Sequence, residues 1–327
     1  MMSETGIKKN SQNFGILWQR YGTFGILFLL LVVLAIAQPG AIFNSSAVPQ
    51  MLKQSAVNIL LACGEFFAIL IAGIDLSVGA VCGLSGMVAA ELMVSAHMPW
   101  VPACIIGVLC GTFFGFLNGL LVNRTGLHPF IITLGTQSIF FGVMLVVSHS
   151  ANIYGFPASF SSMINASLFD FFPISAIIAL LVAVVLWFFT TKTKAGRNTY
   201  ALGGNKEAAW YSGINVPLHT LIVFIISGTC AGIAGIVLMG RLNCADPAAG
   251  TGYDTYAIAA AIIGGTSFMG GKGKIPGVVI GGFIIGIINY GMTALMIDSS
   301  YQKIMMGALI IISVAIDHFV SVSTNEK

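Results

Sequence analysis

The chain has 327 residues, of which 57% are hydrophobic and only 8% are Asp, Glu, Lys or Arg, with a net charge of +3. Soluble globular domains carry roughly 25% charged residues, and these residues on the surface keep the protein soluble. The composition therefore excludes a soluble enzyme and a nucleic-acid-binding protein. It predicts an all-α polytopic membrane protein that has little mass outside the bilayer.

Long apolar windows predict the membrane-spanning helices, because about 20 apolar residues are needed to cross the hydrocarbon. In chain order, we expect ten helices near residues 22–38, 53–73, 78–97, 100–122, 129–149, 173–190, 217–239, 255–269, 276–296 and 303–320. Residues 22–320 would form one transmembrane domain, between cytoplasmic tails at 1–21 and 321–327. The first apolar run could also be a signal peptide, but the polar region before it is unusually long for one. We therefore favour an uncleaved first helix.

The distribution of basic residues predicts that both termini are cytoplasmic. Cytoplasmic loops of membrane proteins carry an excess of Lys and Arg. With ten alternating spans, the loop over residues 150–172, which contains no Lys or Arg, falls outside. The basic residues inside would be Lys8, Lys9, Arg20, Arg124, Lys192, Lys194, Arg197, Lys206, Lys272, Lys274 and Lys327, and those outside would be Lys53, Arg241 and Lys303.

No motif predicts catalysis. The best candidate is the glycine-rich stretch GGTSFMGGKG over residues 264–273, but a phosphate-binding P-loop needs Gly and Ser or Thr where this chain has Thr266 and Gly273. We interpret the stretch as a tight turn between two helices on the cytoplasmic side. The six Cys and five His show no metal-ligand spacing. We therefore expect no catalytic residue, no metal site and no cofactor bound by this chain.

Two acidic residues stand out because ionisable groups within spans are costly and usually functional. Glu65 lies near the middle of the second predicted span, and Asp75 lies in the sequence GIDLSVG at residues 73–79. Polar, glycine-flanked backbone at membrane depth is tolerated only inside protein or beside water. Asp75 could therefore line a pathway or cap the start of the next helix in a reentrant turn. Both interpretations stay open, and they are compatible.

The largest predicted cytoplasmic loop spans residues 191–216 and contains a short helix-forming piece at 205–212. Asn205 can cap this piece, Glu207 favours its positive end, and Gly213 ends it. The alternatives are a docking element for a soluble partner or a solvated linker. The apolar sequence AAWY at residues 208–211 favours docking.

Three stretches resemble the permease subunits of bacterial ABC importers for ribose, xylose, arabinose and allose. They are LLACG at residues 60–64 followed by GIDLSVG at 73–79, YALGGNKEAAWYSGIN at 200–215, and residues 250–277. With general hydropathy, the resemblance covers about residues 20–320. It implies a ten-helix inner-membrane subunit that works as a homodimer and has inverted repeats. It also implies cytoplasmic ATP-binding subunits, which would hold ATP and magnesium, and a periplasmic sugar-binding protein.

The resemblance also implies roles for particular residues. The segment that docks on the ATP-binding subunit corresponds to Gly203, Gly204, Asn205, Glu207, Ala208, Ala209, Gly213 and Asn215. Polar candidates for weak contacts along the sugar pathway are Glu65, Asp75, Ser77, Asn118, Thr133 and Asn289. Ribose-type members usually have uncharged residues where this chain has Glu65, followed by two Phe residues. This departure favours D-allose as the substrate over ribose.

In the outer loop between the seventh and eighth predicted helices, we expect Arg241, Asp246 and Asp254 to help dock the binding protein, since rim charges steer association. An Arg241–Asp246 pair within the chain is the alternative. For the chain as a whole, the alternative to an ABC permease is an ion-coupled secondary transporter. Such transporters usually place paired charged residues at mid-membrane. Here Glu65 lies deep without an evident partner in the sequence.

Overall fold

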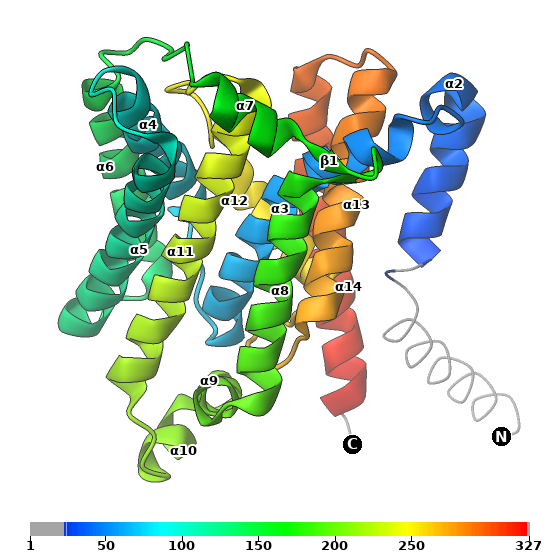
Figure 1. Cartoon of the computed structure of the whole chain (residues 1–327). Coiled ribbons are helices and arrows are strands. Elements are labelled where there is room, and N and C mark those ends of the chain that lie inside the picture. Colours follow the sequence, from blue (N-terminus) through cyan, green and yellow to red (C-terminus); the bar gives the residue numbers. More distant parts are fainter. Residues whose placement is uncertain (1–22, 24, 326–327) are drawn as a thin grey trace, which may run out of the picture.

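A computed structural model describes residue 23 and residues 25–325, and most of this part is helical (Figure 1). The expected N-terminal tail at 1–21 and the start of the first predicted helix lie outside the described residues. At the other end, α14 (Ser299–Asn325) continues well into the tail expected at 321–327.

Within the described residues, six helices are long and apolar enough to cross a membrane. They are α3 (Ala47–Leu70), α5 (Trp100–Thr125), α6 (Pro129–Val147), α8 (Ile174–Lys192), α11 (Val216–Leu242) and α13 (Ile275–Ala294). Shorter apolar helices are Gly25–Ala37, α4 (Val78–Val94), α12 (Tyr253–Ile263) and the segment Ser300–Ile312 of α14. Every predicted span therefore coincides with a helix, which confirms a polytopic membrane protein, while the count of ten spans stays a prediction.

The structure corrects several details of the connections. The predicted span at 255–269 is only the 11-residue α12, about 16 Å long at 1.5 Å per residue. The predicted outer loop 150–172 contains α7 (Ala158–Asn165), and β1 (Ser167–Leu168) pairs antiparallel with β2 (Phe172–Pro173) just after it. The predicted inner loop 191–216 contains two helices, α9 (Lys194–Gly204) and α10 (Lys206–Tyr211), of which α9 was not expected.

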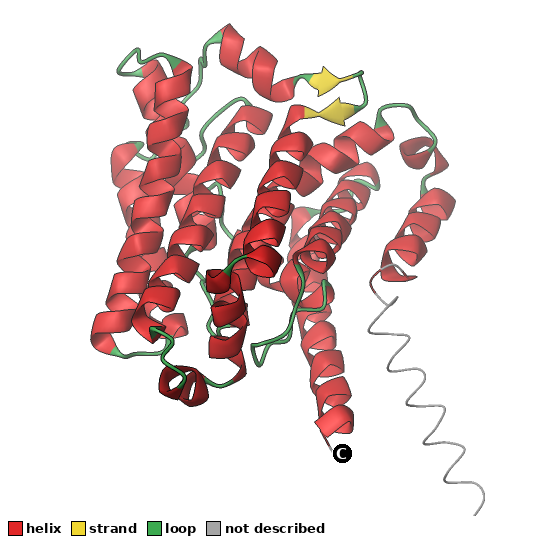
Figure 2. Ribbon diagram, turned by 60° about the horizontal axis from the view of Figure 1, so that its bottom comes forward, coloured by secondary structure: helices red, strands yellow, loops and turns green. Residues whose placement is uncertain are grey.

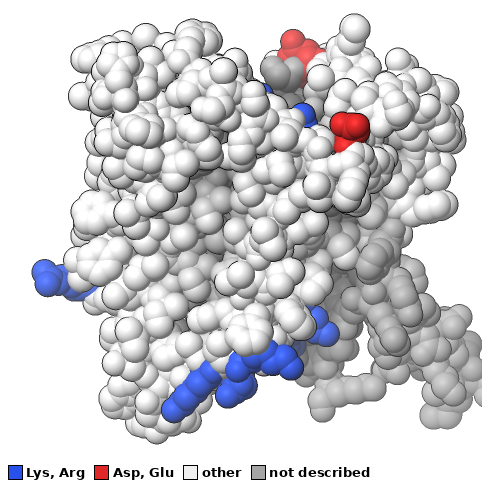
Figure 3. Space-filling model, viewed as in Figure 1, with Lys and Arg blue, Asp and Glu red and all other residues white. Residues whose placement is uncertain are grey.

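The long helices lie side by side, and the short elements lie at the two ends of the bundle (Figures 1 and 2). One end carries α2 (Pro39–Ile42), α7 and the hairpin. The opposite end carries α9 and α10, and α14 ends there. Basic side chains gather at the end with α9 and α10, whereas acidic side chains show at the other end (Figure 3). This distribution is the one that the positive-inside rule predicts if α9 and α10 are cytoplasmic.

Helix α3 lies in the centre of the bundle, packed against α8, α11, α12 and α13. Its burial explains how a helix that contains Glu65 is tolerated in a membrane protein. Glycines bring the neighbouring helices α5 and α11 into backbone contact. A Cβ atom at Gly115 would lie 2.2 Å from the carbonyl oxygen of Phe224, and one at Gly228 would lie 2.3 Å from that of Gly111. Small residues serve this purpose in membrane helix packing.

Candidate functional site

The chain reverses direction between α3 and α4, within the GIDLSVG sequence. Ala72 adopts a left-handed conformation with φ of 58°, and the Gly73 N–H donates to the carbonyl oxygen of Ala68 at 2.9 Å. The following residues run back along α3, so that the Asp75 N–H donates to Oε1 of Glu65 at 3.1 Å. The break between α3 and α4 is therefore a segment that folds back along α3, and its backbone is hydrogen-bonded to the carboxyl group of Glu65.

Asp75 organises the start of α4. Its Oδ1 accepts from the N–H of Ser77 at 3.0 Å and from the Ser77 hydroxyl at 2.6 Å, and its Oδ2 accepts from the Ser227 hydroxyl of α11 at 2.7 Å. An aspartate that binds the backbone two residues ahead forms an Asx turn, which is typical of helix starts. Asp75 therefore lies at the start of α4, as the reentrant-turn interpretation expects, but its side chain binds the N-cap residue Ser77 and not the N–H groups of the first helical turn. A role in a pathway stays a prediction.

Two further helices join this network. The Asn118 side chain of α5 donates to the Ser77 hydroxyl at 2.7 Å. The Thr133 hydroxyl of α6 accepts from the N–H of Leu76 at 3.1 Å and lies 3.1 Å from the carbonyl oxygen of Ile74. The network therefore ties the break to α5, α6 and α11 at once.

Five of the six predicted pathway residues meet in this polar network: Glu65, Asp75, Ser77, Asn118 and Thr133. Asn289 lies elsewhere, on α13, where its Oδ1 accepts from the side chain of Gln302. Ser227 belongs to the network but was missed, because a lone serine in the apolar sequence of α11 gives no signal of its partner.

The polar network is closed in this conformation. Its side chains are at most 1% exposed, so they do not line an open cavity. Two buried acceptors, Oε2 of Glu65 and Oδ1 of Asn118, have no hydrogen-bond partner within the described part of the chain. Leaving a buried acceptor unpaired costs free energy. If the surrounding helices separate, both oxygens can accept a hydrogen bond from water or from a hydroxyl-bearing solute.

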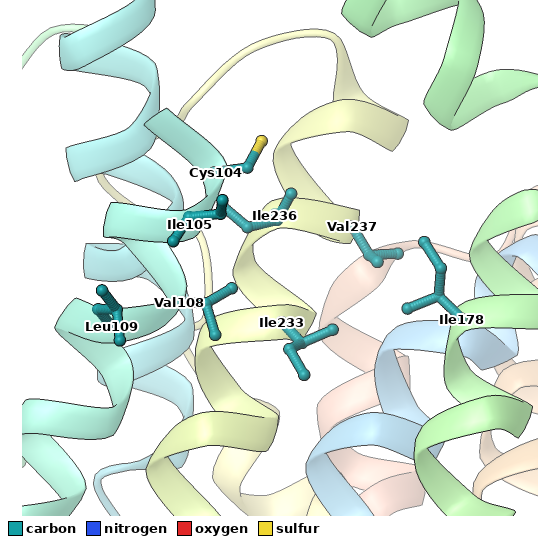
Figure 4. Close-up of a pocket in the computed structure, with 8 residues that line it drawn as sticks. All are labelled: Cys104, Ile105, Val108, Leu109, Ile178, Ile233, Ile236 and Val237. Atoms are coloured by element: carbon teal, nitrogen blue, oxygen red, sulfur yellow. The ribbon is translucent and has the colours of Figure 1, made fainter. Parts of the chain in front are cut away.

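An apolar groove of about 280 Å³ lies between α5, α8 and α11. Figure 4 shows the side chains that line it, namely Cys104, Ile105, Val108, Leu109, Ile178, Ile233, Ile236 and Val237. A sugar would lose its hydrogen bonds to water there and gain none in return. The groove is suited to an acyl chain, and we exclude it as a sugar site.

The predicted coupling segment has well-defined helix ends. Oδ1 of Asn205 accepts from the N–H of Ala208 at 2.9 Å, which caps α10 as predicted. Gly213 has φ of +79° and ends the turn after α10, where its N–H donates to the carbonyl oxygen of Trp210 at 2.9 Å. Oδ1 of Asn215 accepts from the N–H of Leu218 at 3.0 Å and caps α11. These residues therefore fix the shape of the segment.

The end of α9 is in backbone contact with the end of α3 and with the loop between α12 and α13. A Cβ atom at Gly203 would lie 1.7 Å from the carbonyl oxygen of Leu70, and the same oxygen accepts from the N–H of Gly271 at 2.9 Å. The Tyr200 hydroxyl of α9 donates to the carbonyl oxygen of Gly273 at 2.9 Å. The glycine-rich stretch is thus a turn between two helices, as predicted, and it also supports α9.

The two alanines of α10 face different ways. Ala209 is buried with Leu202 and Val216 in a small apolar cluster of its own chain, whereas Ala208 is exposed. Of the two, only Ala208 is therefore accessible at the surface of the chain. Trp210 and Tyr211 are 62% and 80% exposed, and their rings pack edge to face. Two adjacent exposed aromatic rings outside the long helices are typical of anchors at a protein interface.

The predicted receptor-docking residues lie at the opposite end of the bundle. Nη2 of Arg241 donates to the Tyr253 hydroxyl at 3.4 Å, and Oδ1 of Asp246 accepts from the N–H of Ala248 at 2.8 Å. Asp254 lies in the first turn of α12. Arg241 and Asp246 therefore bond to other residues and do not form the intramolecular pair that was the alternative to receptor docking. Docking by these residues stays a prediction.

Comparison with known proteins gives long matches. Residues 48–314 match the family described as the permease component of branched-chain amino acid transport systems. The chain is 52% identical over 314 residues to the D-allose transport system permease protein AlsC of Escherichia coli, with 96% of each chain covered. It is 39% identical over 306 residues to the ribose import permease protein RbsC of Bacillus subtilis, with 93% of this chain and 94% of the relative covered.

A further relative is the galactose/methyl galactoside import permease protein MglC of Escherichia coli. It is 35% identical over 327 aligned residues, and the match covers 94% of this chain and 96% of the relative. No solved structure matches the chain.

Proposed function

This chain belongs to the family of permease components of branched-chain amino acid transport systems, and from that membership we propose which solute it moves and how. Its near-full-length relatives are sugar import permeases, so it is a multi-pass inner-membrane subunit of an ABC sugar importer and not itself an enzyme. Such a permease acts with an ATP-binding subunit and a substrate-binding protein. We propose that the substrate is a monosaccharide, D-allose first and ribose next.

The observation that carries this proposal is the 52% identity to the D-allose permease over 96% of both chains. The ribose permeases are similar over comparable lengths at lower identity. Glu65 supports this order, since the resemblance implies an uncharged residue at that position in ribose-type members.

The mechanism that we propose is alternating access in a homodimer, with ten spans per subunit and both termini in the cytoplasm. ATP and magnesium are held by the partner subunits. The segment over residues 191–216 docks on them, with Trp210, Tyr211, Glu207 and Ala208 exposed for contact. Closure of the ATP-binding subunits moves α10 and therefore α9.

Movement of α9 reaches the membrane domain through backbone contacts, because Gly203 packs on the carbonyl oxygen of Leu70. Leu70 ends α3 and lies five residues beyond Glu65, or about 7.5 Å along the helix axis. The polar network is therefore within reach of a displacement at the coupling segment. When it opens, its carboxylate, amide and hydroxyl groups offer weak contacts to the sugar. Weak contacts suffice, because the binding protein supplies specificity.

The test is reconstitution of the chain with its ATP-binding subunit and binding protein in proteoliposomes. A panel of D-allose, D-ribose, D-galactose, D-xylose and L-arabinose is then offered with ATP inside. We expect ATP-dependent uptake of one or two of these sugars, with D-allose first. Uptake of none of them, or uptake without ATP and binding protein, would refute the proposal.

A further inference from the structure

A polar groove of about 300 Å³ lies at the end of the bundle opposite α9 and α10, where α2, α3 and α13 meet. It is lined by Gln38, Gly40, Ala41, Gln50, Gln54, Tyr290, Thr293 and Ala294. The Tyr290 hydroxyl donates to the carbonyl oxygen of Ala41 at 2.7 Å, which fixes the segment before α3 against α13. The groove is therefore a defined part of the fold, and its size is at the lower end of the ~300–1,000 Å³ range of small-molecule sites.

The chemistry of the lining suits an uncharged, hydroxyl-rich solute. Three carboxamides, one threonine hydroxyl and one tyrosine hydroxyl face or border the groove, and none of the lining side chains is acidic or basic. The side-chain amides of Gln38 and Gln54 make no hydrogen bond within the described residues. An amide both donates and accepts, which matches a sugar hydroxyl. A solute with a carboxylate or a phosphate would find no cation here to pair with.

The groove continues as a polar stripe down α3. Gln50, Gln54 and Asn58 recur every four residues, and Glu65 follows seven residues later, so all four lie on one face of the helix. Asn58 is 1% exposed, and its Oδ1 has no hydrogen-bond partner within the described residues. Polar residues within membrane spans are costly. Their alignment between the groove and the polar network therefore indicates a route for a polar solute.

We propose that this outer groove is a subsite that receives the neutral monosaccharide released by the binding protein. The amides of Gln50 and Gln54 bind the sugar hydroxyls from the α3 side, and Thr293 contacts them from the α13 side. From there the sugar moves along the stripe past Asn58 toward Glu65. This inference rests on the proposed function, because it requires that a sugar arrives at this end of the bundle.

The experiment uses the complete transporter in proteoliposomes, with saturating binding protein loaded with D-allose or D-ribose. The double variant Gln50→Met, Gln54→Met removes both amides and keeps side chains of similar length. The control is Asn152→Leu, which removes an exposed amide from an outer loop. Three quantities are measured: sugar transported per ATP hydrolysed, the concentration of loaded binding protein that half-stimulates hydrolysis, and co-purification with the ATP-binding subunit.

A neutral hydrogen bond is worth roughly two- to tenfold in binding, so we expect at least a threefold fall in sugar transported per ATP in the double variant. Half-stimulation by the binding protein should stay unchanged, and the control should behave like the unmodified chain. If the double variant fails to co-purify, Thr293→Val on the opposite wall replaces it and should lower the same ratio.

An unchanged ratio in an assembled groove variant would overturn the subsite. A groove variant that also needs a different concentration of loaded binding protein for half-stimulation of hydrolysis would overturn the subsite as well. The groove would then be part of the docking surface. If the unmodified complex transports none of the sugars, the proposed function fails, and the subsite fails with it. If only the subsite proposal is wrong, the unmodified complex still transports sugar.

Discussion

Replacement of Gly203 by Ala tests whether α9 transmits movement to α3. The new methyl carbon would lie 1.7 Å from the carbonyl oxygen of Leu70 and 2.7 Å from the backbone nitrogen of Gly271. Ordinary contact begins near 3.4 Å, so the end of α9 has to move by roughly 1.7 Å. The hydrogen bond from Gly271 to Leu70 lies in the same place and would be strained or lost.

The cost of this change follows from its parts. Overpacking costs about 1–3 kcal/mol, and loss of the hydrogen bond adds about 0.5–1.5 kcal/mol. Together they should lower the free energy of unfolding by about 1.5–4.5 kcal/mol and displace α10 from its position. We therefore expect a lower thermal unfolding midpoint in detergent and a lower amount of sugar transported per ATP hydrolysed by the reconstituted complex.

Gly204→Ala is the matched control, because a Cβ atom there meets nothing within 4 Å. Ala is favoured over Gly in a helix by about 0.8–1 kcal/mol, so this variant should be as stable as the unmodified chain or slightly more so. It therefore controls for the change in stability. Equal stability of the two alanine variants, together with unchanged transport per ATP in the Gly203→Ala variant, would refute the role that we give to the contact between α9 and α3.

Four other outcomes are expected. Reporter tags inserted after residues 160 and 204 should be read on opposite sides of the membrane, and the same side for both would contradict the ten-span topology. Gly213→Val should still insert in the membrane but abolish uptake, because φ of +79° disfavours a β-branched residue; normal uptake would remove the segment from the mechanism. Arg241→Glu should weaken stimulation of ATP hydrolysis by the binding protein while assembly stays intact, and unchanged stimulation would remove Arg241 from the docking surface. Ser227→Ala deprives Oδ2 of Asp75 of its donor and should cost about 1–3 kcal/mol, which thermal unfolding would reveal as a lower midpoint.

The acidic residues of the polar network could be found from the sequence, because Glu65 and Asp75 are conspicuous in apolar surroundings. Ser77, Asn118 and Thr133 were also named as polar candidates, but the sequence did not show which groups they bind, and Ser227 was missed. Ser227 lies far along the chain, and only the packing of α11 beside the break brings its hydroxyl to Asp75. Local chemistry thus identified the centre of the network, and tertiary packing decided its membership.

Helix ends and short helices were predicted unevenly, for physical reasons that differ between elements. The cap at Asn205 and the stop at Gly213 depend on neighbouring residues, and both were predicted correctly. Helix α9 was missed because its glycine-rich end has low helix propensity, and its packing on α3 and the glycine-rich loop compensates. The span predicted at 255–269 continued too far, since Gly265 adopts φ of +86° just after α12.

The contrast between α9 and α10 determines which residues can be exchanged between related transporters in a chimera. The end of α9 fits a carbonyl oxygen of its own chain so closely that only glycine is accommodated there, whereas α10 presents Trp210 and Tyr211 to solvent. A chimera designed to accept the ATP-binding subunit of another system should therefore transplant residues 205–213 alone. A graft that begins earlier would carry a foreign α9 surface onto an α3 end with which it did not evolve.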